Sequence, residues 1–554
     1  MEIIRKKRTV QRKKSFTKLV RNQSLRDYIQ DYCNSTSIHG IKYLGETGRP
    51  LGERLSWVLI FIICFYVNGY LIQEVWDKWN DSPVIVSFAE TATPVWNVPF
   101  PAVTICSEVK SRSKIFNFTY YMSNDIFNQN TTDDTTKQKI GDLTLVCDAH
   151  VQVNGEKYAE KRTMDFLLEV TPPFSDTVWE CKWSDLATSC PELFTQILTQ
   201  EGFCYTFNML DKEDLLRGDP FPFLQLHGNR TTGWSLDGGY THNAPLLAYP
   251  RRAFSAGSKA GLTIRMRARD EETDFYCRGP VLGFKVLLHN PAEIPLVRER
   301  YLRSPLNQDV VVVVQPNIMD TSPGLLTYDP HRRQCFFPAE RYLKFFKVYT
   351  QRNCELECLT NHTLEVCGCV GIHMPRYNET KFCGAGKKQC MITAEEELRL
   401  KEVAASYKGT SVTCDCLPAC TSIQYNSENT QANFASESTV ISEKDNTTKS
   451  YKESRISIFF KEMQFTTSRR SELFGVVDFM AHCGGLLGLC CGMSFLSILE
   501  LIYYITFRIW GNIKTKNKEE KKKKEEEKET PETASAAADD AEKKGIAFID
   551  WKNK

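Results

Sequence analysis

The sequence predicts a membrane protein with two transmembrane helices and a large, disulfide-rich, mixed α/β extracellular domain between them. Three observations predict this fold class. Two long apolar runs lie near the ends of the 554-residue chain, basic residues flank both runs, and an even number of cysteines lies between them. The formal net charge of only +2 argues against a broad nucleic-acid-binding surface, so we expect no nucleic acid partner.

The apolar runs have the length that a membrane-spanning helix requires. Residues 55–72 contain no charged side chain over 18 positions, which as a helix would cover roughly 27 Å, close to the thickness of a bilayer's hydrocarbon core. The second span is placed at 473–507, where the stretch 484–507 carries one charge, Glu500. A buried core helix is the alternative for either run, but core helices rarely stay apolar on every face for so long.

The basic flanks predict the orientation of the chain. Residues 1–54 contain 13 lysines and arginines, and further basic residues follow the second run. The positive-inside rule therefore places both termini in the cytosol of a multi-pass plasma-membrane protein in contact with lipid. The parts are a cytosolic arm (1–54), the first span, the extracellular domain (73–472), the second span, and a charged tail (508–554). We expect the tail to be disordered, with a solvated helix as the alternative.

The cysteines support an outside location for the middle of the chain. Sixteen of the 21 cysteines lie in 73–472, and an even count in an oxidising compartment favours eight disulfides. Residues 352–363 are typical of a helix, so Cys354 and Cys358 project from one face and can be joined to one neighbour, for which 414–420 is a candidate. A zinc cluster is the alternative, but histidines at ligand spacing are missing, so we expect no metal and no other cofactor.

The extracellular region contains strand patterns, candidate glycosylation sites and no catalytic motif. Residues 283–289 and 310–315 are rich in β-branched and apolar residues, which favours strands. The glycines and lysines of 384–388 lack the remainder of a phosphate-binding loop, so we do not expect an enzyme. Seven Asn-x-Ser/Thr triplets are candidate glycosylation sites: Asn80, Asn117, Asn130, Asn229, Asn361, Asn378 and Asn446.

The second apolar run carries polar groups that a simple anchor does not need. Its glycines recur every four residues up to Gly492, a pattern that also serves close helix packing in lipid. Ser494, Ser497 and Glu500 follow, and an ionised carboxylate in such a run is costly unless it faces water, an ion or a partner. Hydroxyls and carbonyls can replace part of a cation's hydration shell. We therefore expect a cation path, lined by this helix from several subunits because one helix cannot enclose a pore.

Several motifs of the chain are similar to those of a known family. They are His39-Gly40, PFPAVTIC at 99–106, the block at 333–376, CDCLPAC at 414–420, and GGLLGLCCGMSFLSILELIYY at 484–504. In this order the chain resembles subunits of the epithelial sodium channel/degenerin family, most closely the insect pickpocket type. The resemblance implies a homo- or heterotrimeric, voltage-independent, amiloride-sensitive sodium channel. Its extracellular domain gates it in response to a chemical or mechanical stimulus that the sequence does not specify.

The resemblance also implies roles for individual residues. Gly492, Met493 and Ser494 match the selectivity filter, and Glu500 matches the acidic residue below it. The remaining positions implied in gating are His39, Gly40, Ala481, His482 and Trp79. Ala481 matches the position where bulky side chains hold degenerins open, and Trp79 matches the aromatic that couples the first span to the extracellular domain.

Two positions depart from the family pattern. His482 stands where many members have Asp, and Tyr503 stands where some acid-sensing members have a second acidic residue. A proton sensor is one interpretation of His482 at an outer pore mouth, and the simpler interpretation is a polar neighbour at the interface.

The family connectivity implies seven disulfides and leaves two cysteines, which we predict to form the eighth. The expected pairs are Cys106–Cys204, Cys181–Cys190, Cys335–Cys420, Cys354–Cys416, Cys358–Cys414, Cys367–Cys390, Cys369–Cys383 and, from the remaining two, Cys147–Cys277.

Two other classes share the two-span layout. A scavenger-type lipid receptor without ion conduction would not need the Gly-x-Ser pattern or Glu500. An ATP-gated trimeric channel would need an extracellular cluster of basic residues for the nucleotide phosphates and a different cysteine order.

Overall fold

The computed structural model describes residues 24–81, 84–127, 133–148, 150–221, 224, 232–272, 274–377, 379–409, 413–435, 451–473 and 475–529. The chain forms two compact units. One, here called the helical unit, comprises Met1–Pro83 and Leu473–Lys554, and the other, here called the strand unit, is Val84–Glu472. The basic segment 5–14 and the end of the charged tail lie outside the described residues.

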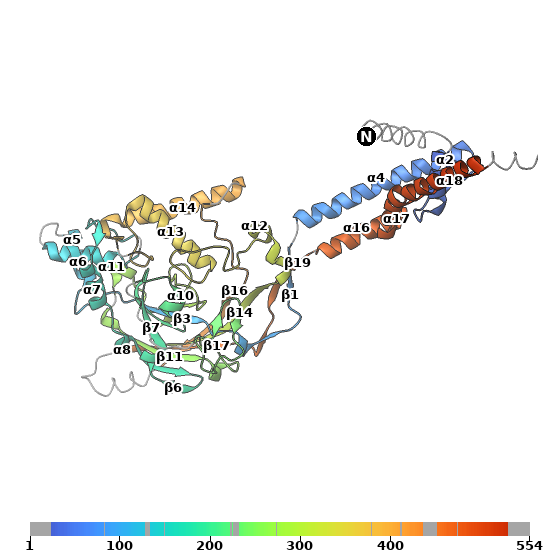
Figure 1. Cartoon of the computed structure of the whole chain (residues 1–554). Coiled ribbons are helices and arrows are strands. Elements are labelled where there is room, and N and C mark those ends of the chain that lie inside the picture. The colour runs from blue at the N-terminus through green and yellow to red at the C-terminus, as the bar shows by residue number, and fades with distance from the viewer. Residues whose placement is uncertain are drawn as a thin grey trace, which may run out of the picture. The chain divides into compact units, whose positions relative to one another are not determined.

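The helical unit begins with α2 (Ser24–Ser35), α3 (Ile41–Gly45) and the long helix α4 (Leu51–Asp81). Helix α4 extends beyond the predicted 55–72 at both ends, because charged residues end an apolar run without ending a helix. Among the described residues α4 is the one helix that is long and apolar enough by itself to cross a membrane. Figure 1 shows α4 beside the helices of the second apolar run.

The second apolar run is not one continuous helix. It forms α16 (Val476–Cys491), α17 (Phe495–Tyr503) and a π-helical turn (Tyr504–Arg508). The helices Val476–Cys491 and Phe495–Thr515 are bent by 70° relative to each other. Only together are they long and apolar enough to cross a membrane. The first part of the tail forms the helix α18 (Ile509–Glu529), the solvated-helix alternative, as a run rich in Lys and Glu allows.

Two sheets form the centre of the strand unit (Figure 1): a larger mixed sheet and a smaller antiparallel sheet. The larger sheet has the order β1-β19-β14-β17-β11-β5-β6, with β16 pairing with β14. Its strands are β1 Val84–Phe88, β19 Ser468–Glu472, β14 Gln308–Thr321, β17 Tyr451–Phe460, β11 Leu262–Arg269, β5 Val178–Trp183, β6 Leu186–Thr188 and β16 Ser422–Asn433. The second sheet comprises β13 Leu302–Pro305, β12 Gly283–His289, β3 Ala102–Ser107, β8 Gly202–Phe207 and β7 Phe194–Thr199.

Side-chain alternation explains why these segments form strands. Val310, Val312 and Val314 of β14 are fully buried, while the residues between them are less buried, so one face of the strand covers the core. The predicted strands 283–289 and 310–315 are confirmed in β12 and β14.

Helices flank the sheets, and two of them are tied together. The longer ones are α5 Phe118–Phe127, α6 Asp134–Thr144, α7 Lys161–Val170, α13 Gln351–Cys367 and α14 Lys388–Lys408. Helix α13 contains the predicted helix 352–363 and lies beside α14 (Figure 1). Short helices are α8 Phe174–Thr177, α9 Cys190–Leu193, α10 Lys212–Leu215, α11 Phe275–Arg278 and α12 Pro330–Arg333. Two-residue strands pair as β2 Thr93–Pro94 with β18 Gln464–Phe465, β4 Tyr158–Ala159 with β15 Phe382–Cys383, and β9 Trp234–Ser235 with β10 Gly239–Tyr240.

The strand unit contains eight disulfides, in the pairing that the resemblance and the two remaining cysteines predicted. They are Cys106–Cys204, Cys147–Cys277, Cys181–Cys190, Cys335–Cys420, Cys354–Cys416, Cys358–Cys414, Cys367–Cys390 and Cys369–Cys383. The helix face of Cys354 and Cys358 is therefore joined twice to one segment. Such cross-links restrict the unfolded chain and so favour the folded state.

A buried carboxylate, Glu201, lies in the turn between β7 and β8 and forms ion pairs with several cations. Its side chain is fully buried and contacts four cations, Lys110 (3.0 Å), Arg278 (2.7 Å), Lys285 (3.1 Å) and Arg298 (3.3 Å). Burial alone would raise the pKa of Glu201, but these four positive charges hold it below its usual value. Lys110 and Arg278 are almost fully buried. Arg278 also pairs with Glu108 and Asp148, whereas Glu201 is the one carboxylate within ion-pair distance of Lys110 among the described residues.

Replacing Glu201 by Gln is expected to destabilise the strand unit by about 3–5 kcal/mol, because it leaves the buried Lys110 and Lys285 without a carboxylate partner among the described residues. Thermal unfolding of the purified full-length protein measures the effect. Glu365→Gln, an exposed position on α13, is the matched control and should change stability little. Equal unfolding temperatures for the two variants would contradict the importance of Glu201.

Candidate functional site

The break in the second apolar run lies at Gly492, Met493 and Ser494. Helix α16 ends because Gly492 adopts the left-handed conformation (φ 64°), and its N–H donates to the carbonyl of Gly488 at 2.9 Å. Helix α17 begins at Ser494, where a reciprocal cap forms. The Ser494 N–H donates to Ser497 Oγ (3.1 Å), and the Ser497 N–H donates to Ser494 Oγ (3.3 Å). The three residues predicted to form a filter are therefore the three that leave the helix.

The predicted His39-Gly40 motif packs directly on this break. The His39 N–H donates to the carbonyl of Cys491 at 3.0 Å. The His39 ring lies so close to the Cα of Gly492 that a Cβ there would be 2.7 Å from it. Gly40 itself has φ 86°, a conformation that other residues rarely adopt. The structure thus brings together two predicted sites that are more than 400 residues apart in the sequence.

Ser37 links the same segment to the polar residues of α17, a role that sequence reasoning missed. Its Oγ lies 2.9 Å from Ser497 Oγ, and Ser497 is only 1% exposed. The Ser37 hydroxyl and N–H also donate to Glu500 Oε2, at 3.4 and 3.5 Å. Ser497 and Glu500 therefore share one polar neighbour. The position of Ser37, two residues before His39, is the sequence signal that could have indicated this role.

Asn68 of α4 is a second residue that sequence reasoning missed. It is 1% exposed, and its Nδ2 donates to the carbonyl of Cys64 (3.0 Å) and to Cys491 Sγ (3.5 Å). Its Oδ1 is buried without a hydrogen-bond partner in the described part of the chain. Asn68 thus connects the first apolar helix to the last helical residue before the break. It is the one amide side chain in the apolar run 55–72, which was the available signal.

The contacts of the π-helical turn hold α2 against the end of the second run. The Tyr28 hydroxyl donates to the carbonyl of Tyr504, and Arg508 lies 3.1 Å from Asp31. Tyr32 packs edge-on against the Tyr504 ring. The segment that carries Ser37 and His39 is therefore held at both ends of α17, by His39 at the break before it and by α2 at the π-helical turn after it.

The predicted gating residues on α16 lie apart from the break. Ala481 and His482 are exposed on α16, roughly three helical turns before Gly492. Trp79 of α4 stacks on Phe479 of α16, with ring centroids 5.3 Å apart, and Trp76 contacts both rings. The structure places Trp79 in an aromatic cluster two residues from Ala481 along α16.

Three of the predicted glycosylation sites are described, and each is exposed: Asn80, Asn117 and Asn361. Asn130, Asn229, Asn378 and Asn446 lie outside the described residues. Within the described ranges, no cluster of histidine, cysteine or acidic side chains has the arrangement of a metal site.

Comparison with known proteins identifies relatives over most of the chain. Pickpocket protein 28 of Drosophila melanogaster is 29% identical over 86% of this chain and 78% of its own length. The sodium channel protein Nach of the same species is 22% identical over 88% of this chain and 89% of its own length. Acid-sensing ion channel 2 of Rattus norvegicus is 25% identical, with 86% of each chain covered.

The model of the amiloride-sensitive sodium channel family matches residues 32–504, which include both the His39-Gly40 motif and the helix break. The match confirms the resemblance to epithelial sodium channel/degenerin subunits of the pickpocket type, a family of ion channels rather than enzymes. The chain therefore belongs to the amiloride-sensitive sodium channel family.

Proposed function

We propose that the protein is a subunit of a voltage-independent, amiloride-sensitive, sodium-selective channel of the plasma membrane. Three copies, alike or with related subunits, surround a pore formed by the second apolar run. Both α4 and the bent pair α16–α17 cross the membrane, and both termini lie in the cytosol. The scavenger-type lipid receptor is not favoured, because a lipid anchor has no use for a polar break in its helix.

The observation that carries this proposal is the helix break at Gly492–Ser494 within an apolar run. Backbone that leaves a helix at membrane depth is tolerated only where protein covers it or where it lines a water-filled cavity. His39 covers the break from one side in a single subunit. In the proposed trimer the other side faces the axis, where carbonyl and hydroxyl oxygens can replace a sodium ion's hydration shell.

Polar groups below the break extend the same path. Ser497 and Glu500 follow Ser494 on α17, and Ser37 holds both through its hydroxyl. A carboxylate at this depth favours cations over anions and is stable there only beside water, an ion or hydrogen-bond donors. The donors of Ser37 meet that requirement in part.

A stimulus acting on the strand unit can reach the pore through two covalent connections. Helix α4 leads into β1, and α16 follows β19. Strands β1 and β19 pair antiparallel, and the residues next to the two helices, Val84 and Glu472, are register partners. Both helices are thus attached to one end of one strand pair, so a displacement of that pair pulls on both. Gating is then a shift between closed and open populations.

Whole-cell recording in sodium, with and without amiloride, tests conduction, using the chain alone and with candidate partner subunits. Ser494→Leu is expected to abolish the current or its sodium preference, because an isobutyl group replaces an oxygen of the filter. Ser56→Leu, on the first apolar helix, is the matched control and should leave selectivity unchanged. Normal sodium preference in a surface-expressed Ser494→Leu channel would contradict the filter assignment.

Ala481→Val is expected to raise the resting sodium current several-fold, because a branched side chain at this exposed position on α16 disfavours close approach of the helices in the closed state. Current at rest, normalised to surface protein, measures this. Ala481→Ser, nearly equal in size, should behave like the unmodified channel. An unchanged resting current in Ala481→Val would exclude Ala481 as a gate position.

Asn68→Leu is expected to reduce the sodium-to-potassium permeability ratio by about fivefold, the effect of losing roughly one hydrogen bond that positions the break. Reversal potentials in mixed sodium and potassium solutions give the ratio. Ser56→Leu again serves as control on the same helix. If Asn68→Leu changed only the amount of channel at the surface, Asn68 would have a folding role and no part in positioning the filter.

A further inference from the structure

Strand β11 presents a row of arginines on the face opposite the core. Leu262, Ile264 and Met266 are fully buried, and the alternate positions carry Arg265, Arg267 and Arg269. Arg265 is compensated by two carboxylates, Glu180 at 2.9 Å and Glu453 at 2.8 Å. Arg267 and Arg269 have no carboxylate within 4 Å among the described residues. One strand therefore carries both matched and unmatched positive charges.

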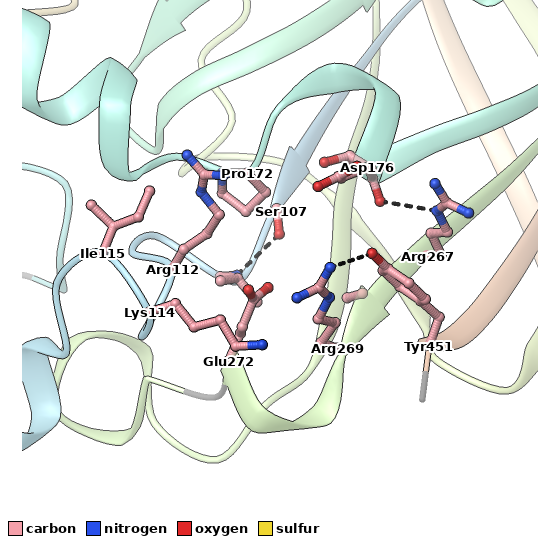
Figure 2. A pocket seen from close by; sticks show the side chains of 13 residues that line it. Ser107, Arg112, Lys114, Ile115, Pro172, Asp176, Arg267, Arg269, Glu272 and Tyr451 are labelled. Atoms are coloured by element: carbon pink, nitrogen blue, oxygen red, sulfur yellow. Dashed lines mark hydrogen bonds between the residues drawn. The ribbon is translucent and has the colours of Figure 1, made fainter. Parts of the chain in front are cut away.

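The two unmatched arginines line a cavity of about 90 Å³. Arg112 and Lys114, in the loop after β3, line the same cavity together with Asp176, Glu272 and Tyr451. Figure 2 shows Arg112 and Lys114 on one side, Arg267 and Arg269 on the other, and Glu272 between them. Four cations and two carboxylates give the cavity an excess of two positive charges.

The charges around the cavity do not pair directly with one another. No two of these six charged side chains, all in the described part of the chain, lie within ion-pair distance. Arg267 donates to the backbone carbonyls of Ser175 and Asp176, and Arg269 donates to the Tyr451 hydroxyl. Arg112 donates to the carbonyl of Glu169 through Nη2, whereas its Nε is buried without a partner. Unused donors therefore remain on the cavity wall.

We propose that this cavity binds one tetrahedral oxyanion, a sulfate or phosphate group, between Arg269, Arg112 and Lys114. Such a group is small enough for a space that holds several water molecules. Guanidinium groups match its oxygens in geometry as well as charge, and an ammonium adds a flexible third donor. Lys114 is exposed, so the cavity is open to solvent. A free ion can therefore enter it, and so can an ester group carried by an extracellular saccharide.

Glu272 offsets part of the positive charge around the cavity. Burial raises the pKa of Glu272, although the charges of Arg269, Arg112 and Lys114 oppose this rise. The carboxylate lies among these cations without contacting any of them, so it lowers the repulsion between them and also repels an incoming anion. Neutralising Glu272 should therefore strengthen anion binding, which distinguishes a binding site from a structural charge cluster.

Thermal unfolding of the purified full-length protein at constant ionic strength tests the proposal, with sodium sulfate titrated against sodium chloride. We expect a saturable rise in the unfolding temperature with sulfate, as for any ligand that binds only the folded state. Sulfate also stabilises proteins generally by exclusion from their surface, but that effect does not saturate at low concentration. A purely linear rise would therefore overturn the proposal.

Two variants with opposite expected effects sharpen the test. Lys114→Gln should weaken sulfate binding at least about tenfold, since it removes one charged donor, and it breaks no hydrogen bond among the described residues. Glu272→Gln should strengthen binding several-fold. Lys259→Gln, an exposed lysine of the same unit outside the cavity, is the control and should bind like the unmodified protein. Identical titrations for Lys114→Gln and Lys259→Gln would overturn the assignment.

A second titration separates the two sources of the group. A sulfated disaccharide and its desulfated form are compared with free sulfate, each on the unmodified protein and on Lys114→Gln. Tighter binding of the sulfated disaccharide than of sulfate assigns the site to a saccharide ester, and the reverse assigns it to the free ion. Binding of the desulfated form as tightly as the sulfated form would overturn an oxyanion site.

Discussion

The backbone of Gly492, Met493 and Ser494 departs from the helix in the middle of an apolar stretch. That constraint determines much of what surrounds them, because backbone polar groups in an apolar environment need a hydrogen-bond partner or water. Gly492 supplies the left-handed turn, Ser494 and Ser497 cap the next helix, and the His39 segment covers one side. The segment before the first apolar helix thus packs as part of the second apolar run.

The strand unit is heavily cross-linked and contains charged side chains in its interior. Eight disulfides restrict the chain. Two of them, Cys354–Cys416 and Cys358–Cys414, join one face of α13 to its neighbouring segment at two points. Glu201 compensates the buried cations between the connecting segments. In the proposed gating, these cross-links reduce the displacement that is absorbed within the unit before it reaches the paired strands β1 and β19.

Matched and unmatched charges lie close together in this unit, and the contrast between them is informative. Around Glu201 and Arg265, opposite charges lie in direct contact at 2.7–3.1 Å. Around Glu272 the cations remain separate although they share one small cavity. Among the described residues the cations around this cavity have no direct carboxylate partner, and the proposed oxyanion site rests on this arrangement.

The sequence by itself determined the two apolar runs, the number of disulfides, the strands 283–289 and 310–315, and the helix that carries Cys354 and Cys358. These features follow from local composition, period and parity, which a linear pattern records. Within the run 484–507, Gly492 and Ser494 are residue types that end and begin helices, but the sequence did not indicate the 70° angle between the two helices. The lysine-rich start of the tail allowed either a solvated helix or disorder, and the structure shows a helix there. Only the tertiary structure decided that Ser37 meets Ser497 across 460 residues, that Asn68 reaches Cys491, and that Arg112 shares a cavity with Arg269. Each of these contacts joins segments that are distant in the chain, and their proximity results from packing of the whole unit rather than from any local preference.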